Sequence, residues 1–251
     1  MARRLLEAGA LHQKIRAIDV KDARILNSLS PQELERALTG RRLSTAVRHG
    51  KRLFLQIQSG KWLTLHLGLT GWPVVLEKGS PEPRYTRLRI DFEGGAALAL
   101  EDLRIFGEVG LTESPQAFLS QRGVGTDALQ MDKGSFLTAM SGRKGRIKPS
   151  LLDQGLIAGL GNLYADEALF QSGICPQARC LKRNRLEVLF CAIQEVLRTS
   201  LACNADFERL PDSYLLPHRR PGGACPWDGA LLEKIKIAGR TCYYCPLHQK
   251  E

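Results

Sequence analysis

Residues 146–170 contain the pattern with the clearest chemistry, a Gly-x-Gly-Asn turn between two apolar segments. Lys148 lies at the start of the first segment, and Gly159, Gly161 and Asn162 interrupt the apolar pattern before a second helix begins. Glycines permit a tight turn and leave the first N–H groups of that helix uncovered. Uncovered N–H groups at a helix start bind anions, and phosphate is the natural one. The pattern therefore predicts a phosphate site, with an ordinary corner between two helices as the alternative.

The composition favours a nucleic-acid partner. The 251 residues carry a formal net charge of +10 and a pI near 9.5, an excess that suits a polyanion or serves solubility alone. No apolar run reaches the length of a membrane span, and the first residues are too charged for a signal peptide. We therefore expect a soluble cytoplasmic protein. The odd count of seven cysteines excludes a full disulfide framework, and we expect Cys175, Cys180, Cys191 and Cys203 to be reduced, mostly structural thiols.

The first half of the chain has the pattern of one helix followed by an antiparallel β-sandwich. Residues 2–14 predict a helix, residues 14–25 a strand, and Ser30 with Pro31 the start of a short helix to residue 38. From residue 42 to 111, apolar and polar residues alternate in segments that glycine turns separate. The segments that we expect to be strands include residues 53–57, 62–67, 88–92 and 97–100.

The second half is predicted to be helical and to end in a compact hairpin. Helical periodicity runs from residue 135 to 207, and the apolar stripe within residues 186–197 is typical of a core. The predicted fold class is therefore α+β. Along the chain we expect a sandwich domain at 1–112, a linker at 113–130, a helical domain at 131–210 and a hairpin at 211–251.

The helical turn closely resembles the helix–two-turn–helix element of the formamidopyrimidine-DNA glycosylase/endonuclease VIII family. The resemblance rests on Ile147-Lys148-Pro149, Leu152-Asp153 and Gly161-Asn162-Leu163-Tyr164-Ala165. In that family the asparagine and the lysine hold phosphates of damaged DNA, which implies the same roles for Asn162 and Lys148. Together with motifs in the first half and in the tail, the resemblance covers nearly the whole chain in order.

Two loops of the first half match the family's means of filling the gap that a flipped nucleotide leaves in a duplex. The sequence His66-Leu67-Gly68-Leu69-Thr70-Gly71 matches the loop whose fourth residue is an apolar wedge, here Leu69. The sequence Glu101-Asp102-Leu103-Arg104-Ile105-Phe106-Gly107 matches the loop that supplies an arginine to the orphaned base and a stacking phenylalanine, here Arg104 and Phe106. Ile105 stands where many members have a second arginine. Lys51 matches a lysine near the phosphate of the flipped nucleotide.

The tail has two short pairs of ligand residues at the ends of a predicted hairpin, an arrangement that suits a tetrahedral zinc site. The family's zinc finger has four cysteines with the spacing C-x2-C-x16-C-x2-C. The same spacing here gives Cys225, Asp228, Cys245 and His248. Cys242 is the alternative fourth ligand if Asp228 instead caps the Asp-Gly turn, and a hairpin without metal is the other reading. Arg240 stands where the family places an arginine on the phosphates beside the lesion.

The family's catalytic segment has no match in this sequence. That segment resembles Pro-Glu-Leu-Pro-Glu-Val-Glu and precedes the first helix; its N-terminal proline attacks the sugar, and a glutamate handles protons. This chain starts inside that helix, and no proline precedes Pro31. Catalytic residues of the family type are therefore not identifiable. The amines that remain are Lys51 and the terminus of Met1, and either could form a Schiff base.

The resemblance implies a base-excision-repair protein that binds damaged double-stranded DNA, with zinc as its cofactor. It implies an enzyme of the DNA glycosylase and AP lyase class, and we expect a monomer with no membrane partner. Because the catalytic segment is missing, the protein is either a full enzyme whose true start lies upstream or a non-catalytic binder of lesions and abasic sites. We expect this 251-residue chain to show little base excision and at most slow nicking. A transcription regulator would need a recognition helix and a dimer seam, and the sequence shows neither.

Overall fold

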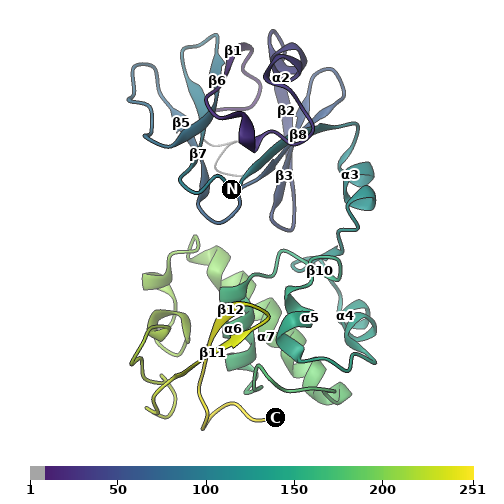
Figure 1. Ribbon diagram of the computed structural model, residues 1–251, viewed down its shortest axis with the longest axis vertical. Helices are drawn as coiled ribbons and strands as arrows, with labels where there is room; N and C mark the ends of the chain where they lie inside the picture. Colours follow the sequence, from purple (N-terminus) through teal and green to yellow (C-terminus); the bar gives the residue numbers. More distant parts are fainter. Residues whose placement is uncertain (1–8) are drawn as a thin grey trace. The chain divides into compact units, whose positions relative to one another are not determined.

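The computed structural model describes residues 9–251. The chain divides into two compact units between Gly123 and Val124, a point inside the segment that the sequence marks as a linker (Figure 1). None of the helices within residues 9–251 combines the length and the hydrophobicity that a membrane-crossing helix needs. Each unit has its own buried cluster of apolar side chains.

The first unit is the expected antiparallel sandwich, made of two four-stranded sheets with the orders β1-β6-β7-β5 and β2-β3-β4-β8 (Figure 1). The first sheet contains β1 (Ile15–Val20), β6 (Thr86–Phe92), β7 (Ala97–Asp102) and β5 (Gly71–Leu76). The second contains β2 (Leu43–His49), β3 (Arg52–Ile57), β4 (Trp62–His66) and β8 (Glu108–Thr112). Leu55 and Leu63 of one sheet and Ile90 and Leu98 of the other belong to the same buried cluster, so the apolar faces of the sheets form the core.

Local sequence signals explain where the first unit's helices begin. Helix α2 (Pro31–Leu38) starts with a capping box, in which the Ser30 side chain accepts from Glu33 N–H and the Glu33 carboxylate accepts from Ser30 N–H. The strand expected over residues 14–25 is shorter, because Asp22 caps the 3-10 helix η1 (Ala23–Ile25) that follows β1. Helix α3 (Pro115–Gln121) follows β8.

The helix expected over residues 2–14 lies mostly outside the described residues. Its described part, residues 9–14, holds no helix. The backbone of Gly9 and His12 lies in the left-handed region, with φ of 71° and 67°, and a right-handed helix cannot pass through such residues. This part of the expectation is therefore wrong.

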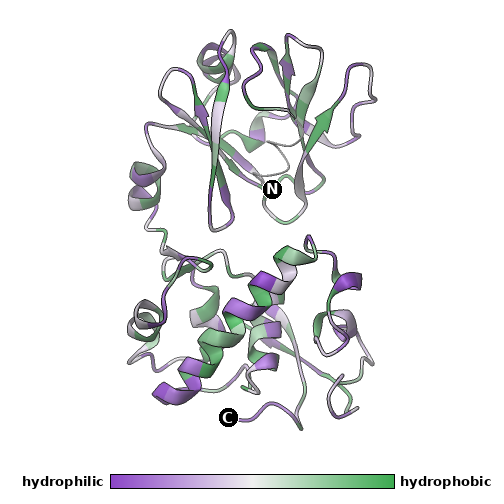
Figure 2. Cartoon of the chain, turned by 180° about the vertical axis from the view of Figure 1, so that it is seen from behind, coloured by the Kyte–Doolittle hydropathy of each residue, from purple (hydrophilic) through white to green (hydrophobic). Residues whose placement is uncertain are grey.

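The second unit contains the expected pair of helices around the glycine turn. Helix α5 (Ile147–Leu152) and helix α6 (Asn162–Gln171) are separated by the short strand β10 (Ile157–Ala158), which pairs with β9 (Thr126–Asp127). Helix α7 (Arg183–Ala202) packs against α6 and α4 (Lys133–Met140). Figure 2 shows its apolar stripe, which is buried at five positions: Leu186, Leu189, Ile193, Val196 and Leu197.

A β-hairpin completes the second unit. After the 3-10 helices η2 (Phe207–Arg209) and η3 (Leu216–His218), strands β11 (Glu233–Ile237) and β12 (Arg240–Tyr244) pair through a two-residue turn. Both turn residues have positive φ, 47° at Ala238 and 75° at Gly239, as a tight hairpin requires. A small buried cluster joins this tail to α6: Phe170, Leu215, Cys225, Leu232, Tyr243 and Cys245.

Candidate functional site

The start of α6 presents backbone N–H groups without a side-chain cap. Gly161 occupies the N-cap position, and within residues 9–251 no side chain caps the first turn of the helix. Asn162 donates from Nδ2 to the carbonyl oxygen of Thr241 on β12 at 2.9 Å. Its buried Oδ1 has no hydrogen-bond partner among the described residues. The helix start is thus held beside the hairpin with its positive end uncovered, which is the local geometry of an anion site.

Arg240 lies beside this helix start. It is the first residue of β12, its side chain is exposed, and the next residue in the chain is the Thr241 that Asn162 contacts. The structure therefore brings together two of the predicted phosphate contacts, Asn162 and Arg240, within the second unit.

A buried carboxylate one turn into α6 holds these elements together. Asp166 is fully buried; Lys148 Nζ lies 2.5 Å from its Oδ1, and Arg219 donates from Nη2 to its Oδ2 at 2.8 Å. The same Nη2 donates to Thr241 O at 2.8 Å, and Cys242 Sγ donates to Asp166 Oδ1 at 3.0 Å. One side chain therefore connects α5, α6, the segment after η3 and β12.

This arrangement changes the interpretation of Lys148. Its side chain is fully buried, and its ammonium group faces the Asp166 carboxylate inside the protein. The predicted direct contact with a phosphate does not fit that placement. A buried carboxylate needs a cation, and Lys148 supplies it.

Glu167, the next residue of α6, holds the segment before the hairpin. Its Oε1 accepts from Leu215 N–H at 3.0 Å and its Oε2 from Leu216 N–H at 2.8 Å. Burial raises the pKa of Glu167, although these donors act in the opposite direction. Sequence reasoning assigned no role to Asp166 or Glu167, although two adjacent acids in an apolar helix are a signal that both have buried partners.

The predicted wedge residues of the first unit are exposed at loop tips. Leu69, in the loop between β4 and β5, is 74% exposed, and Phe106, in the loop between β7 and β8, is 50% exposed. The guanidinium of Arg104 lies over the Phe106 ring, 4.7 Å from its centroid. Because the two loops touch at Gly68 and Phe106, these exposed apolar side chains lie on neighbouring loops and form a candidate binding surface. Lys51 is exposed in the turn between β2 and β3, and the next residue, Arg52, pairs with His66 at the end of β4, where the first of these loops begins.

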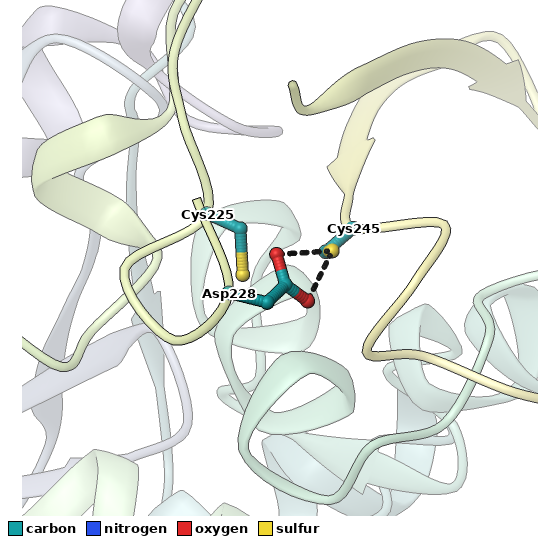
Figure 3. Close-up of side chains that lie close together, drawn as sticks. All are labelled: Cys225, Asp228 and Cys245. Carbon is teal, nitrogen blue, oxygen red and sulfur yellow. Dashed lines mark hydrogen bonds between the residues drawn. The ribbon is translucent and has the colours of Figure 1, made fainter. Parts of the chain in front are cut away.

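Three of the predicted metal ligands converge in the tail (Figure 3). The ligand atoms of Cys225, Asp228 and Cys245 all lie within 4.8 Å of one another. Asp228 Oδ1 also accepts from Ala230 N–H at 2.9 Å, which lowers the pKa of that carboxyl, so the turn cap and the ligand role coexist. Burial raises the pKa of Cys245 to about 11. Two sulfurs and a carboxylate oxygen are donors that a tetrahedral metal accepts.

The other two candidates lie outside this group. His248 Nε2 bonds to Phe170 O at 2.8 Å, and the His248 ring packs against the ring of Trp227 with centroids 4.2 Å apart. Cys242 points to Asp166, and burial raises its pKa to about 12, so it stays a thiol. Cys242 is therefore wrong as the alternative ligand, because it belongs to the Asp166 network. The side-chain position of His248 does not complete the site as it stands.

Two family models match this chain. The model of the formamidopyrimidine-DNA glycosylase N-terminal domain matches residues 1–109, and that of the formamidopyrimidine-DNA glycosylase H2TH domain matches residues 124–210. A formamidopyrimidine-DNA glycosylase of Arabidopsis thaliana is 31% identical over 99% of this chain and 69% of its own length. The protein of that name from Acaryochloris marina is 34% identical over 90% of this chain and 88% of its own length.

Solved structures with the same fold contain DNA. The complex of the Lactococcus lactis Fpg with abasic-site DNA superposes with a TM-score of 0.88 at 28% identity, covering 100% of this chain and 97% of that one. A complex of MutM with DNA that contains carbocyclic 8-oxo-G has the same TM-score, identity and coverage.

Proposed function

Because the chain belongs to the formamidopyrimidine-DNA glycosylase family, we propose that it acts in base-excision repair on duplex DNA with damaged or abasic sites. The observation that carries the proposal is the exposed pair of wedge residues, Leu69 and Phe106, with Arg104 stacked on the latter. Apolar side chains at loop tips fill the gap that an extruded nucleotide leaves, and an adjacent arginine hydrogen-bonds the unpaired base.

The second unit supplies the grip on the backbone in this proposal. The uncapped start of α6 and Asn162 bind one phosphate, and Arg240 at the hairpin tip binds a neighbouring one. Lys148 acts indirectly: it neutralises Asp166, the α6 carboxylate that accepts from the Cys242 thiol of β12. The net charge of +10 favours the approach to DNA.

Glycosylase and lyase chemistry proceeds through an amine that attacks the sugar, and the amine must be unprotonated near neutral pH. A terminal α-amine has a reference pKa of about 8, whereas the reference pKa of a lysine side chain is about 10.4. Lys51 is more useful as a charged contact to a phosphate than as a nucleophile. We therefore assign it to DNA binding.

The variant Lys51→Ala tests this assignment. We expect it to weaken binding to an abasic duplex by about tenfold, the effect of one lost charged contact. Borohydride trapping of the Schiff base, measured at saturating protein, should be unchanged by the substitution. Lys61→Ala is the matched control, since Lys61 lies in another exposed turn of the same sheet. Trapping that disappears only in Lys51→Ala would make Lys51 the nucleophile, and no trapping in any variant would point to binding without catalysis.

We also propose that the tail holds one zinc ion. The support is the convergence of Cys225, Asp228 and Cys245, together with a fourth donor, His248, three residues after Cys245. His248 Nε2 contacts a backbone carbonyl, so Nδ1 is the nitrogen that would bind the metal, and its side chain must shift toward the other three ligands to do so. A bound zinc ties the two ends of the hairpin together where the local core is small.

Metal analysis of purified protein should give about one zinc per chain, as one four-ligand site requires. Cys245→Ser should lose the metal and weaken DNA binding by about tenfold, because the hairpin that carries Arg240 is no longer fixed. Cys191→Ser, at an exposed cysteine of α7, should change neither property. A wild-type protein with less than about half an equivalent of zinc would contradict the single-site assignment.

A further inference from the structure

Asp102, the last residue of β7, contacts both loops that carry the wedge residues. We name residues 67–70 the first wedge loop and residues 103–107 the second wedge loop. The Asp102 side chain is fully buried. Its Oδ1 accepts from Thr70 Oγ1 of the first loop at 2.5 Å, and its Oδ2 accepts from Gly107 N–H of the second loop at 2.7 Å. One carboxylate therefore takes donors from two segments more than thirty residues apart in the chain.

A further contact closes the link between the loops. The backbone N–H of Arg104 lies 3.2 Å from Asp102 Oδ1 and 3.1 Å from Thr70 Oγ1 and donates to both. The second wedge loop is therefore bonded to the carboxylate and to the first wedge loop. Burial acts to raise the pKa of Asp102, but the donors from Thr70, Gly107 and Arg104 outweigh it, and the pKa is lowered. The carboxylate is thus charged at neutral pH, and hydrogen bonds to a charged acceptor are roughly twice as strong as neutral ones.

The second wedge loop needs such support because its backbone is strained. Ile105 has a φ of 56°, in the left-handed region that β-branched residues avoid. Strained residues persist only where their surroundings fix them, and the Asp102 bonds lie on either side of Ile105, at Arg104 and Gly107.

The two loops also touch directly. Gly68 has a φ of 59°, and a Cβ at this position would lie 2.6 Å from the carbonyl carbon of Phe106. Only glycine permits this approach. The tips that carry Leu69 and Phe106 are therefore packed against each other before any ligand binds.

We propose that Asp102 is a positioning residue whose carboxylate locks the two wedge loops into one preorganised unit, so that Leu69 and Phe106 enter a duplex together. The lock follows from the contacts within the first unit, whereas its use on DNA rests on the proposed function. A loop that is already ordered loses less conformational freedom on binding, so the lock increases affinity for the damaged site.

Hydrogen exchange of the protein without DNA tests the lock by itself. In Asp102→Asn, the amide keeps only one acceptor oxygen, and we expect exchange to speed up by about tenfold in both wedge loops together. Thr70→Val leaves the carboxylate in place and should act in the same direction more weakly. Asp91→Asn is the control, since Asp91 lies on the neighbouring strand β6 and pairs with Arg89 at 2.9 Å, away from both loops. Faster exchange in neither loop, or in only one, would overturn the proposal.

A double-variant comparison tests its use on DNA. Asp102→Asn should weaken binding to an abasic duplex by about tenfold in the wild-type background. In the Leu69→Ala/Phe106→Ala background, which has no wedge side chains to position, Asp102→Asn should change the affinity for the abasic duplex little. If Asp102 were merely structural, the substitution would lower the affinity by the same factor in both backgrounds. If wild-type protein shows no preference for the abasic duplex, the proposed function fails, while the exchange result still decides whether the lock exists.

Discussion

Replacing Asp166 with alanine should lower the free energy of unfolding of the second unit by about 3–5 kcal/mol, the cost of breaking a buried charge pair from one side. The substitution leaves Lys148 fully buried and Arg219 nearly so, with side-chain exposures of 0% and 13%, without their carboxylate. It also removes the acceptor of the Cys242 thiol. DNA affinity should fall as well, because Asp166 joins α6 to the strand that carries Arg240.

Urea unfolding followed by Trp227 fluorescence measures this loss. Trp227 is the one tryptophan of the sequence after residue 123. The substitutions Trp62→Phe and Trp72→Phe remove the other two tryptophans, so that the fluorescence reports on the second unit alone. Asp153→Ala is the matched control, at a carboxylate whose side chain is 47% exposed, and should cost at most about 1 kcal/mol. Adding Lys148→Met to Asp166→Ala should recover part of the stability, since the unpaired charge is then gone. An Asp166→Ala protein as stable as the control would refute the role of Asp166 as the centre of the second unit.

The regular elements could be predicted from the sequence because their signals are local. Alternation of apolar residues predicts β3, β4, β6 and β7, and the serine–proline pair before residue 32 predicts the start of α2. The glycine turn likewise predicts a helix that begins within one residue of Asn162. Each of these patterns is read within a few positions along the chain.

The partners of individual side chains could not be predicted in the same way. A motif names Lys148 but not Asp166, eighteen positions later, as the group that it faces. The cysteine spacing identifies three converging ligands, whereas the orientation of His248 depends on the Phe170 carbonyl, seventy-eight positions earlier. Such contacts are set by packing between segments that are distant in the chain, and the spacing of residues within a motif does not predict them. The adjacent acids Asp166 and Glu167 in an apolar helix are the one local sign of them.

The proposed function predicts selective binding of damaged DNA, with separate contributions from the two units. A side chain that stacks in a duplex contributes about 1–3 kcal/mol, so an abasic duplex should bind about tenfold or more tightly than an intact one. Phe106→Ala should remove most of that preference and leave the affinity for intact duplex nearly unchanged. Arg240→Ala should instead weaken both affinities by a similar factor, because a phosphate contact carries no information about the lesion.

Salt dependence distinguishes the two contributions further. Each phosphate contact lowers the logarithm of the binding constant with a slope of about −0.9 against the logarithm of salt concentration. Arg240→Ala should therefore reduce the slope by about one unit, and Phe106→Ala should leave it unchanged.

The central measurement is a titration of the wild-type protein against two duplexes of one sequence, one intact and one with a central abasic-site analogue, at several salt concentrations. The exposed wedge of Leu69 and Phe106 beside Arg104 predicts tighter binding of the abasic duplex at every salt concentration, with nearly the same slope for both duplexes. Equal affinity for the two duplexes would contradict the proposed function.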